Sequence, residues 1–169
     1  MNMKIINQKL KGVLLVLTIC LVPVAGFSTN QEQIAPNFTV QHLLDDARIS
    51  LDQYKGKVVY LDFWASWCPP CLKSFPFMDE LQAEYGDEGF VVIAVNLDEN
   101  SQDAREFMGG TQVSFFIGRD EQGDVAASYD VKVMPSSYLI GRDGLIKEVH
   151  RGFRGSDKDK IRQSVSSLL

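Results

Sequence analysis

The sequence predicts an α/β sandwich built around a mixed β-sheet. Two apolar, β-branched runs, over 58–64 and 90–98, indicate buried strands, and a segment with helical periodicity follows each of them. The chain then closes with a hairpin pattern over 136–152 and a final amphipathic helix. Strands that alternate with helices before a terminal hairpin are typical of a mixed sheet covered by helices. With 169 residues and 45% hydrophobic content, the chain suits one such domain.

The first 26 residues are predicted to be a secretory signal peptide that is removed from the mature protein. Three lysines precede an uncharged stretch of 15 residues over 13–27, and small residues follow Pro23. This stretch is shorter than the roughly 20 apolar residues of a spanning helix, so an uncleaved anchor is the alternative. We therefore expect an exported protein, in the periplasm or otherwise outside the cytoplasmic membrane. The polar residues 27–36 are expected to be a flexible lead-in to a domain over 37–169.

The composition limits which cysteines of the mature chain can form a disulfide and which classes of partner the chain can bind. Cys20 lies in the predicted signal peptide, so Cys68 and Cys71 are the one candidate pair for a disulfide in an exported protein. Beyond residue 26 the sequence has 22 acidic and 14 basic residues, a net charge of −8. Because nucleic acids attract basic surfaces, this charge argues against a nucleic-acid partner.

The first half of the domain predicts a hairpin, a buried strand and a helix. The segments 37–40 and 48–51 are the two short strands of the hairpin. The β-branched and aromatic run over 58–64 is the buried strand. Apolar residues then recur at helical spacing over 70–85. Pro70 is tolerated in the first helical turn, because no backbone N–H is needed there.

The second half of the domain predicts shorter elements around a second buried strand. This strand is the apolar run over 90–98, and a helix with a polar cap begins at Ser101. The remaining elements, in chain order, are a short strand over 115–118, a helical segment around 126–129, the hairpin over 136–152 and a helix that begins near Ser156.

Two cysteines separated by two prolines stand at the predicted junction between the strand over 58–64 and the helix after it. This places Cys68 at the N-terminus of the helix, where unpaired N–H groups and the helix dipole favour the thiolate. In such motifs the pKa of the thiol falls from about 8.5 to roughly 3.5 to 7.5. Cys68 is therefore the predicted nucleophile. Cys71, one turn further along, is the predicted resolving thiol that attacks the mixed disulfide.

Three other roles for the cysteine pair fit the sequence less well. A structural disulfide stabilises more when it closes a longer loop, and this loop is short. A zinc site needs two further ligands, but His42 and His150 are far apart and lack ligand spacing. Haem attachment needs a histidine directly after the second cysteine, where Leu72 stands. The pattern thus favours redox chemistry and implies neither a metal nor an organic cofactor.

The stretches VVYLDFWASWCPPC and KVMPSSYLIGRDGLI, with the spacing between them, resemble the thioredoxin superfamily, in particular its exported TlpA- and ResA-like thiol-disulfide oxidoreductases. The resemblance covers about residues 34–169. It implies a thioredoxin fold, in which a central mixed sheet has helices on both faces, with an N-terminal β-hairpin extension. It also implies a cis peptide bond before Pro135, beside the cysteines. A trans proline in an ordinary turn is the alternative.

The resemblance assigns substrate binding to the surroundings of the cysteines. A cis proline lacks a backbone N–H and presents the peptide groups of the residue before it to an extended substrate. Trp67 is expected to form a wall of the substrate groove, with a half-buried ring over the end of the sheet as the alternative. Phe63 and Trp64 are expected in the core. The implied substrate-binding residues are Trp67, Pro69, Pro70, Met134 and Pro135.

Two positions depart from the TlpA- and ResA-like pattern. Asp62 stands where those proteins more often carry asparagine, and Ser74 stands where ResA-like proteins carry glutamate. A carboxylate is wanted near Cys71, because a buried thiol must lose its proton before it attacks, and a desolvated acid with a raised pKa can accept that proton. Asp62 is therefore the predicted proton relay. The alternative is an ion pair of Asp62 with Lys57 or Lys73.

These observations predict a periplasmic-type thiol-disulfide oxidoreductase that reduces disulfides in exported proteins. The resemblance implies a membrane electron donor of the DsbD or CcdA kind. Residues 98–134 are too few for the long helical insertion usual in DsbA-like oxidants, which favours a reductant. The alternatives are an apocytochrome c thiol reductase and a binding or chaperone module on the same fold. We expect a monomer without a nucleic-acid partner.

Overall fold

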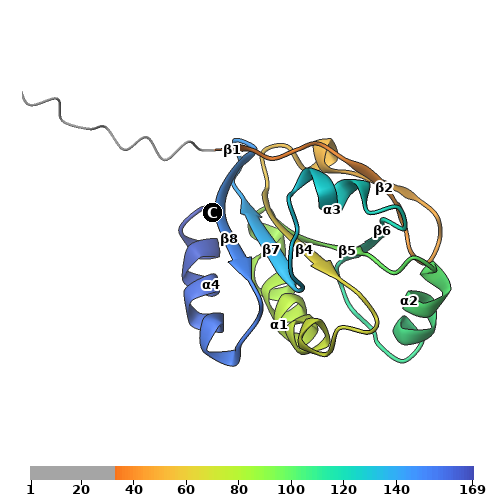
Figure 1. Cartoon of the computed structure of the whole chain (residues 1–169). Coiled ribbons are helices and arrows are strands. Elements are labelled where there is room, and N and C mark those ends of the chain that lie inside the picture. The colour runs from red at the N-terminus through yellow and green to blue at the C-terminus, as the bar shows by residue number, and fades with distance from the viewer. Residues whose placement is uncertain (1–32) are drawn as a thin grey trace, which may run out of the picture. The chain divides into compact units, whose positions relative to one another are not determined.

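The computed structural model describes residues 33–169, which form one β-sheet with helices packed against its two faces (Figure 1). The predicted signal peptide, and the predicted lead-in up to residue 32, lie outside the described residues. The helices and strands, in chain order, are β1 (Gln33–Ile34), β2 (Thr39–His42), β3 (Arg48–Ser50), β4 (Val58–Trp64), α1 (Pro69–Tyr85), β5 (Phe90–Asn96), α2 (Ser101–Met108), β6 (Phe116–Arg119), α3 (Asp124–Ser128), β7 (Ser136–Ile140), β8 (Leu145–Arg151) and α4 (Lys158–Ser166). Short 3-10 helices lie at Leu51–Tyr54, Gly86–Glu88 and Gly155–Asp157.

The strands form a mixed sheet, as the sequence predicts. Their order is β1-β8-β7-β4-β5-β6-β2-β3. β4, β5 and β6 run parallel to one another, whereas β7 pairs with β4, and β8 with β7, in the antiparallel direction. Every residue of β4 and of β5 is buried, because helices cover both faces at the centre of the sheet. The segment after Trp64 therefore leaves the sheet from a central strand.

The two faces of the sheet carry two separate hydrophobic clusters. Alternate side chains of a strand point to opposite faces. On β4, Tyr60 and Trp64 pack with apolar residues of α1, α2 and α4, on what we call the α1 face. Leu61 and Phe63 pack on the other face, with Ala126 of α3. Phe63 and Trp64 are fully buried, which confirms the expectation that both belong to the core.

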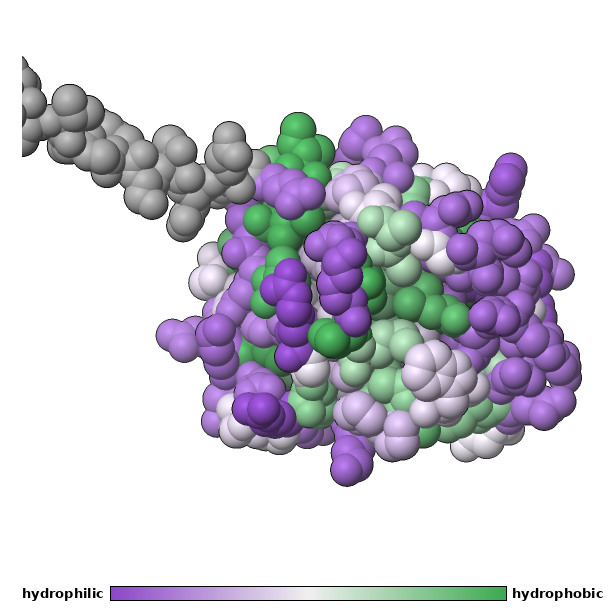
Figure 2. All heavy atoms as spheres, viewed as in Figure 1, coloured by the Kyte–Doolittle hydropathy of each residue, from purple (hydrophilic) through white to green (hydrophobic). Residues whose placement is uncertain are grey.

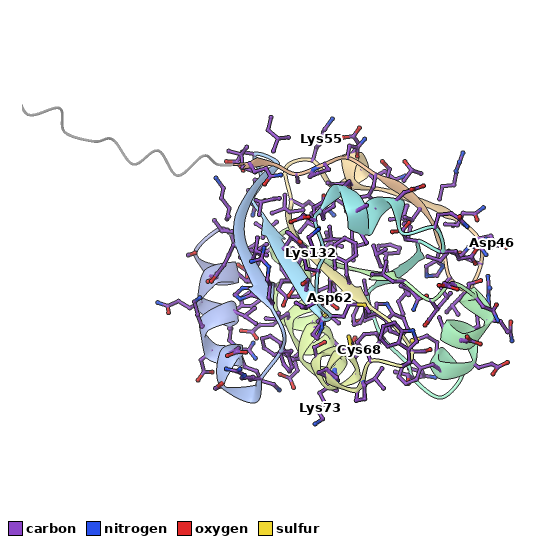
Figure 3. The ribbon with its side chains drawn as sticks, viewed as in Figure 1. Asp46, Lys55, Asp62, Cys68, Lys73 and Lys132 are labelled. Atoms are coloured by element: carbon purple, nitrogen blue, oxygen red, sulfur yellow. A yellow bond between two sulfur atoms is a disulfide. The ribbon has the colours of Figure 1, made fainter. Side chains whose placement is uncertain are left out.

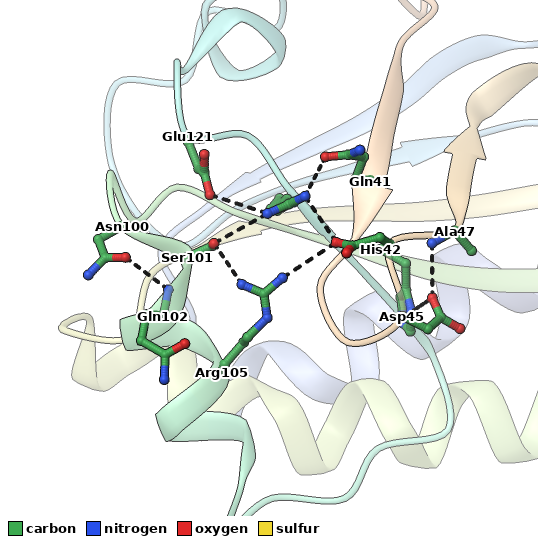
Figure 4. Close-up of polar contacts among 11 residues, drawn as sticks. Gln41, His42, Asp45, Ala47, Asn100, Ser101, Gln102, Arg105 and Glu121 are labelled. Carbon is green, nitrogen blue, oxygen red and sulfur yellow. Dashed lines mark hydrogen bonds and ion pairs between the residues drawn. The ribbon is translucent and has the colours of Figure 1, made fainter.

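The predicted N-terminal hairpin is present as β2 and β3, and polar contacts join it to the rest of the domain (Figure 4). Oδ1 of Asp46, in the turn between the two strands, accepts from Arg119 of β6 at 3.0 Å and from Arg105 of α2 at 3.5 Å. Arg119 also donates to Gln41 of β2 and, at 3.5 Å, to Ser101. We call these contacts the hairpin clamp, because they connect β2, β6 and α2.

The structure differs from the predicted lead-in at its C-terminal end. Gln33 and Ile34 form β1, which pairs antiparallel with β8, although the sequence analysis expects a flexible segment up to residue 36. Ala35 is buried and donates its N–H to the carbonyl of Gly144 at 3.0 Å. The physical reason is that β8 would otherwise be an edge strand with unpaired backbone groups, which a polar segment can satisfy as readily as an apolar one.

Candidate active site

The two cysteines lie at the junction between β4 and α1. After β4 ends at Trp64, a three-residue turn leads to Cys68, whose extended backbone makes it the N-cap of α1. Pro69 and Pro70 occupy the first turn of the helix, where proline removes no hydrogen bond. The amide of Cys71 donates to the carbonyl of Cys68 at 3.0 Å. The predicted placement of Cys68 at the start of the helix is thus what the structure has.

Cys68 and Cys71 form a disulfide and differ in exposure. Cys71 is fully buried on the α1 face, whereas Cys68 keeps 5% of its surface exposed. In Figure 3, Cys68 lies at the start of α1, and Lys73 points away from the sheet into solvent. Cys68 also lines a groove at the surface, whereas Cys71 does not.

A groove of about 450 Å³ opens beside Cys68. It is lined by Trp67, Cys68, Pro69, Pro70 and the segment 131–134. Trp67 is 66% exposed and lines one side of this groove. Figure 2 shows hydrophobic and near-neutral side chains gathered over the middle of this side of the molecule, with hydrophilic side chains around them. Apart from Lys132, the residues that line the groove are largely apolar, so the groove offers apolar surface next to Cys68.

The peptide bond between Met134 and Pro135 is cis, as the resemblance implies. β7 begins directly after it at Ser136, which pairs with Phe63 of β4. The carbonyl of Pro135 accepts from Gly152 at 2.7 Å, so this carbonyl is already used within the fold. Met134 lines the groove beside Cys68 together with Trp67. Residues 131–133, which precede Met134, line the same groove.

Asp62 is a buried acid on the same face of the sheet as the cysteines. It stands on β4 between Tyr60 and Trp64, whose side chains pack in one cluster with Cys68 and Cys71. Only 1% of Asp62 is exposed, and burial raises the pKa of its carboxyl well above the ordinary value. Among the described residues, no ion pair joins it to Lys57 or Lys73.

Ser137 is the partner of this carboxyl, a residue that the sequence analysis does not single out. Ser137 lies opposite Asp62 on β7. Burial raises the pKa of the Asp62 carboxyl, and the hydrogen bond from Ser137 lowers it by a smaller amount. The Ser137 hydroxyl is also 2.7 Å from the hydroxyl of Tyr60. Oδ2 of Asp62 is buried and has no hydrogen-bond partner among the described residues. One oxygen of Asp62 is thus free to receive a proton.

Ser74 does not supply a second acidic group. It is buried in α1, and its hydroxyl donates to the carbonyl of Cys71 at 2.7 Å, one turn back along the helix. A serine in this bond is neutral and cannot accept a proton from a thiol at ordinary pH. Ser74 therefore adds no carboxylate to the one that Asp62 places on this face of the sheet.

A second buried acid, Asp98, supports the turn before the cysteines and is also missed by the sequence analysis. It lies just beyond β5, which ends at Asn96, two residues earlier than predicted. The Asp98 carboxylate accepts from the amide and hydroxyl of Ser66 and from the side chain of Asn96. The available signal was its position: polar residues at the carboxyl end of a strand beside β4 meet the segment that leaves β4.

Residues 33–169 contain neither a metal-binding cluster nor a membrane-spanning helix. No group of three or more histidine, cysteine, aspartate or glutamate side chains in this range is arranged to hold a metal ion. No helix in the same range has the length and apolar character to cross a membrane.

Comparison with known proteins places this geometry in a family. The family model described as Redoxin matches residues 30–165. The thiol-disulfide oxidoreductase ResA of Bacillus thuringiensis subsp. konkukian is 33% identical over 155 residues, which cover 86% of this chain and 89% of the relative.

Solved structures show the same relationship. A Chlorobium tepidum protein assigned as the thiol:disulfide interchange protein DsbE superposes with a TM-score of 0.78 and 41% identity, covering 81% of this chain and 96% of that one. The exposed lipoprotein thioredoxin Etrx1 of Streptococcus pneumoniae superposes with a TM-score of 0.70 and 32% identity, covering 79% of this chain and all of that one. The thioredoxin fold implied by the sequence is confirmed.

Proposed function

The chain belongs to the Redoxin family and is a thiol-disulfide oxidoreductase, and we propose that it works as a reductant of disulfides in exported proteins. The observation that carries the proposal is the arrangement of the cysteine pair. Cys68 caps α1 beside an open groove, and Cys71 is buried one turn further along the helix. This arrangement gives the two sulfurs different tasks.

The reaction starts from the reduced pair. The thiolate of Cys68, favoured by the positive end of the α1 helix dipole, attacks one sulfur of the substrate disulfide. A bond forms between Cys68 and that sulfur, and the other substrate sulfur leaves as a thiolate. Cys71 then attacks the sulfur of Cys68, which closes the Cys68–Cys71 disulfide and releases the second substrate thiolate. Two electrons pass from the cysteine pair to the substrate.

Asp62 removes the proton from Cys71 before the second attack. A fully buried thiol holds its proton, because burial disfavours the thiolate. The carboxylate of Asp62 is a base on the same face of the sheet, and its raised pKa brings its proton affinity closer to that of a thiol. Ser137 orients this carboxylate by binding it from β7. We therefore assign Asp62 as the general base and Ser137 as a residue that positions it.

The polypeptide substrate docks in the groove beside Cys68. The exposed ring of Trp67 forms one wall, and Met134, with Pro135 after it, forms the other. Pro69 and Pro70 close the floor next to the sulfur. Because Pro135 carries no N–H, an extended substrate pairs with the backbone of Met134. This contact requires no particular substrate sequence, so it suits an enzyme that acts on several proteins.

The direction of reaction is supported by two features. Between β5 and β7 the chain forms only α2, β6 and α3, and the two helices have 8 and 5 residues, so the fold lacks a long helical insertion. The two residues between the cysteines are prolines, which add no positive charge to stabilise the thiolate of Cys68. A strongly stabilised thiolate is what makes a dithiol pair oxidising, so the pair here is expected to be reducing.

The reduction potential of the pair tests the proposed direction. Equilibration of the purified protein with glutathione buffers is expected to give a value nearer to about −270 mV than to about −120 mV, the values of thioredoxin and DsbA. The two values differ by roughly 7 kcal/mol at about 1.4 kcal/mol per 30 mV. A potential more oxidising than about −150 mV would contradict the proposal, because such a pair donates its disulfide to substrates.

The site of action and the partners follow from the same proposal. We place the protein outside the cytoplasmic membrane, on the strength of the predicted signal peptide and of the relative named as an exposed lipoprotein. Its substrates are disulfide-containing exported proteins, and apocytochrome c is the specific candidate that the resemblance to ResA-like proteins suggests. A membrane electron donor of the DsbD or CcdA kind regenerates the dithiol, and the protein acts as a monomer.

A further inference from the structure

The buried carboxylate of Asp98, from another part of the chain, forms hydrogen bonds with the turn between β4 and Cys68. Only 2% of Asp98 is exposed. Its Oδ2 accepts from the amide of Ser66 at 3.1 Å and from Nδ2 of Asn96 at 2.7 Å. Its Oδ1 accepts from the hydroxyl of Ser66 at 3.1 Å. A buried carboxylate is costly unless it is hydrogen-bonded, and here both oxygens are satisfied.

Two backbone hydrogen bonds hold the turn together with the hydrogen bonds of Asp98. At its start, the carbonyl of Trp64 accepts from Leu97 at 2.9 Å, and at its end the amide of Cys68 donates to Ala65 at 3.1 Å. Ser66 lies between these two bonds and is held by Asp98 through both its backbone and its side chain. The turn is therefore tied at three successive points, of which the middle one depends on a side chain.

The hydrogen bonds between Ser66 and Asp98 also hold the backbone that leads into Trp67, the next residue in the chain. Because 66% of Trp67 is exposed, little packing of its own ring fixes its position. The direction in which the ring leaves the backbone must then come from the turn itself. When a wall orients the reacting groups, a movement of about 1 Å lowers the reaction rate by up to about 100-fold. Loosening Ser66 should thus affect docking more than the chemistry of the sulfur.

We propose that Asp98 is a positioning residue of the thiol-disulfide reaction, which holds Ser66 and so fixes Trp67 as a wall of the polypeptide groove beside Cys68. This inference deepens the proposed function and rests on Cys68 as the attacking sulfur. Asp98 touches neither the substrate nor the cysteines in this role. It acts through the turn, so its loss should separate the docking of a polypeptide from the reactivity of the thiol.

The test compares Asp98→Asn with the wild-type protein in the full chain. Asparagine keeps the volume but turns an NH₂ group toward donors that need an acceptor. We expect faster hydrogen exchange at the Ser66 amide and a loss of about 10-fold in the second-order rate constant for reduction of insulin. Alkylation of Cys68 by iodoacetamide, expressed per thiolate from its pH profile, should stay within about twofold, because this small reagent needs no groove.

The matched control is Asp120→Asn. Asp120 is also buried, at 8% exposure, and its carboxylate accepts from the amide of Ala126 in α3 at 3.0 Å and not from a residue of the turn. This variant should leave the insulin rate unchanged. Equal losses in both Asp→Asn variants, or an unchanged insulin rate in Asp98→Asn, would overturn the proposal. So would an alkylation rate that falls in parallel with the insulin rate.

Two further measurements keep the test decisive. If Asp98→Asn does not fold, Ser66→Ala removes the hydroxyl donor alone and should lower the insulin rate about threefold, and no loss would count against the proposal. If the wild-type protein does not reduce insulin, the proposed direction fails. The same comparison is then made with the oxidised protein and reduced insulin chains, which use the same groove, and an unchanged rate in Asp98→Asn still overturns the inference.

Discussion

At the scale of single residues, the division of labour between the cysteines rests on one helical turn. Cys68 lies at the N-cap and reaches the groove, whereas Cys71 is completely buried. The positive end of the α1 helix dipole favours a thiolate at Cys68, and burial disfavours one at Cys71. The same sequence spacing thus yields two sulfurs of different reactivity.

Alkylation of the reduced protein measures this difference. At neutral pH we expect iodoacetamide to modify Cys68 at least about 10-fold faster than Cys71, because only the thiolate reacts and only Cys68 is accessible. Peptide mass spectrometry after short reaction times identifies the modified residue. Equal rates, or faster modification of Cys71, would show that Cys68 is not the attacking sulfur.

Asp62→Asn tests the general base. The amide keeps the shape of the side chain but cannot take a proton from Cys71. We expect the mixed disulfide to form at nearly the wild-type rate and to be resolved about 10- to 1,000-fold more slowly near neutral pH, in the range typical of general base catalysis. Rapid quenching followed by mass spectrometry separates the two steps. A similar loss in both steps would point to a structural role.

The raised pKa of Asp62 also gives the pH dependence of stability a definite sign. Burial favours the protonated form, so Asp62 stabilises the fold at low pH, and this contribution is lost as the pH rises through the raised pKa. Asp62→Asn removes the titration. In denaturant unfolding of the oxidised protein, we expect the variant to exceed the wild type by at least about 1 kcal/mol at alkaline pH, and by less at pH 4. A difference that is independent of pH would contradict the shift.

At the scale of elements, the hairpin clamp shows how an N-terminal extension is joined to the sheet. β2 pairs with β6 through only two residue pairs, so its backbone contact is short. The side chain of Arg119 is 21% exposed and reaches Gln41, Asp46 and Ser101, on three different parts of the chain. Several hydrogen bonds to one partly buried cation make a stronger connection than an isolated surface pair.

Arg119→Ala should therefore weaken the hairpin without touching the cysteines. We expect a loss of about 1 to 2 kcal/mol in the free energy of unfolding and faster hydrogen exchange in β2. Lys55→Ala is the control, since the ion pair of Lys55 with Asp52 is exposed and should contribute less than about 0.5 kcal/mol. An Arg119→Ala variant as stable as the control would show that the clamp contributes nothing measurable. The alkylation rate of Cys68 should be the same in both.

At the scale of the whole molecule, the buried resolving cysteine allows partners to be captured. Cys71→Ser cannot close the Cys68–Cys71 disulfide, so the mixed disulfide with a substrate should persist. Expressed in its own compartment, this variant is expected to accumulate covalent complexes that dissolve under dithiothreitol, and mass spectrometry then identifies the substrates. Cys68→Ser is the control and should capture at least about 10-fold less, because Cys71 is buried. Equal capture by both variants would contradict the proposed order of attack.

The sequence alone determined the order of the elements from β2 onward and the chemistry of the cysteine pair. The runs over 58–64 and 90–98, and the periodicity over 70–85, are local patterns that indicate their own conformation. The position of Cys68 at the start of α1 follows from the same local boundary. These features need no knowledge of distant residues, because backbone conformation and side-chain periodicity are set within a few turns or a single strand.

Only the tertiary structure decided which polar groups serve that pair. Ser137 meets Asp62 because β7 lies next to β4 in one particular register, and a shift of one residue would turn Ser137 to the other face. Asp98 meets Ser66 because β5 runs parallel to β4 and both strands end at the same edge of the sheet. Likewise, β1 exists because β8 offers it a free edge. Such contacts join residues far apart in the chain, and the register that creates them is a property of the whole sheet.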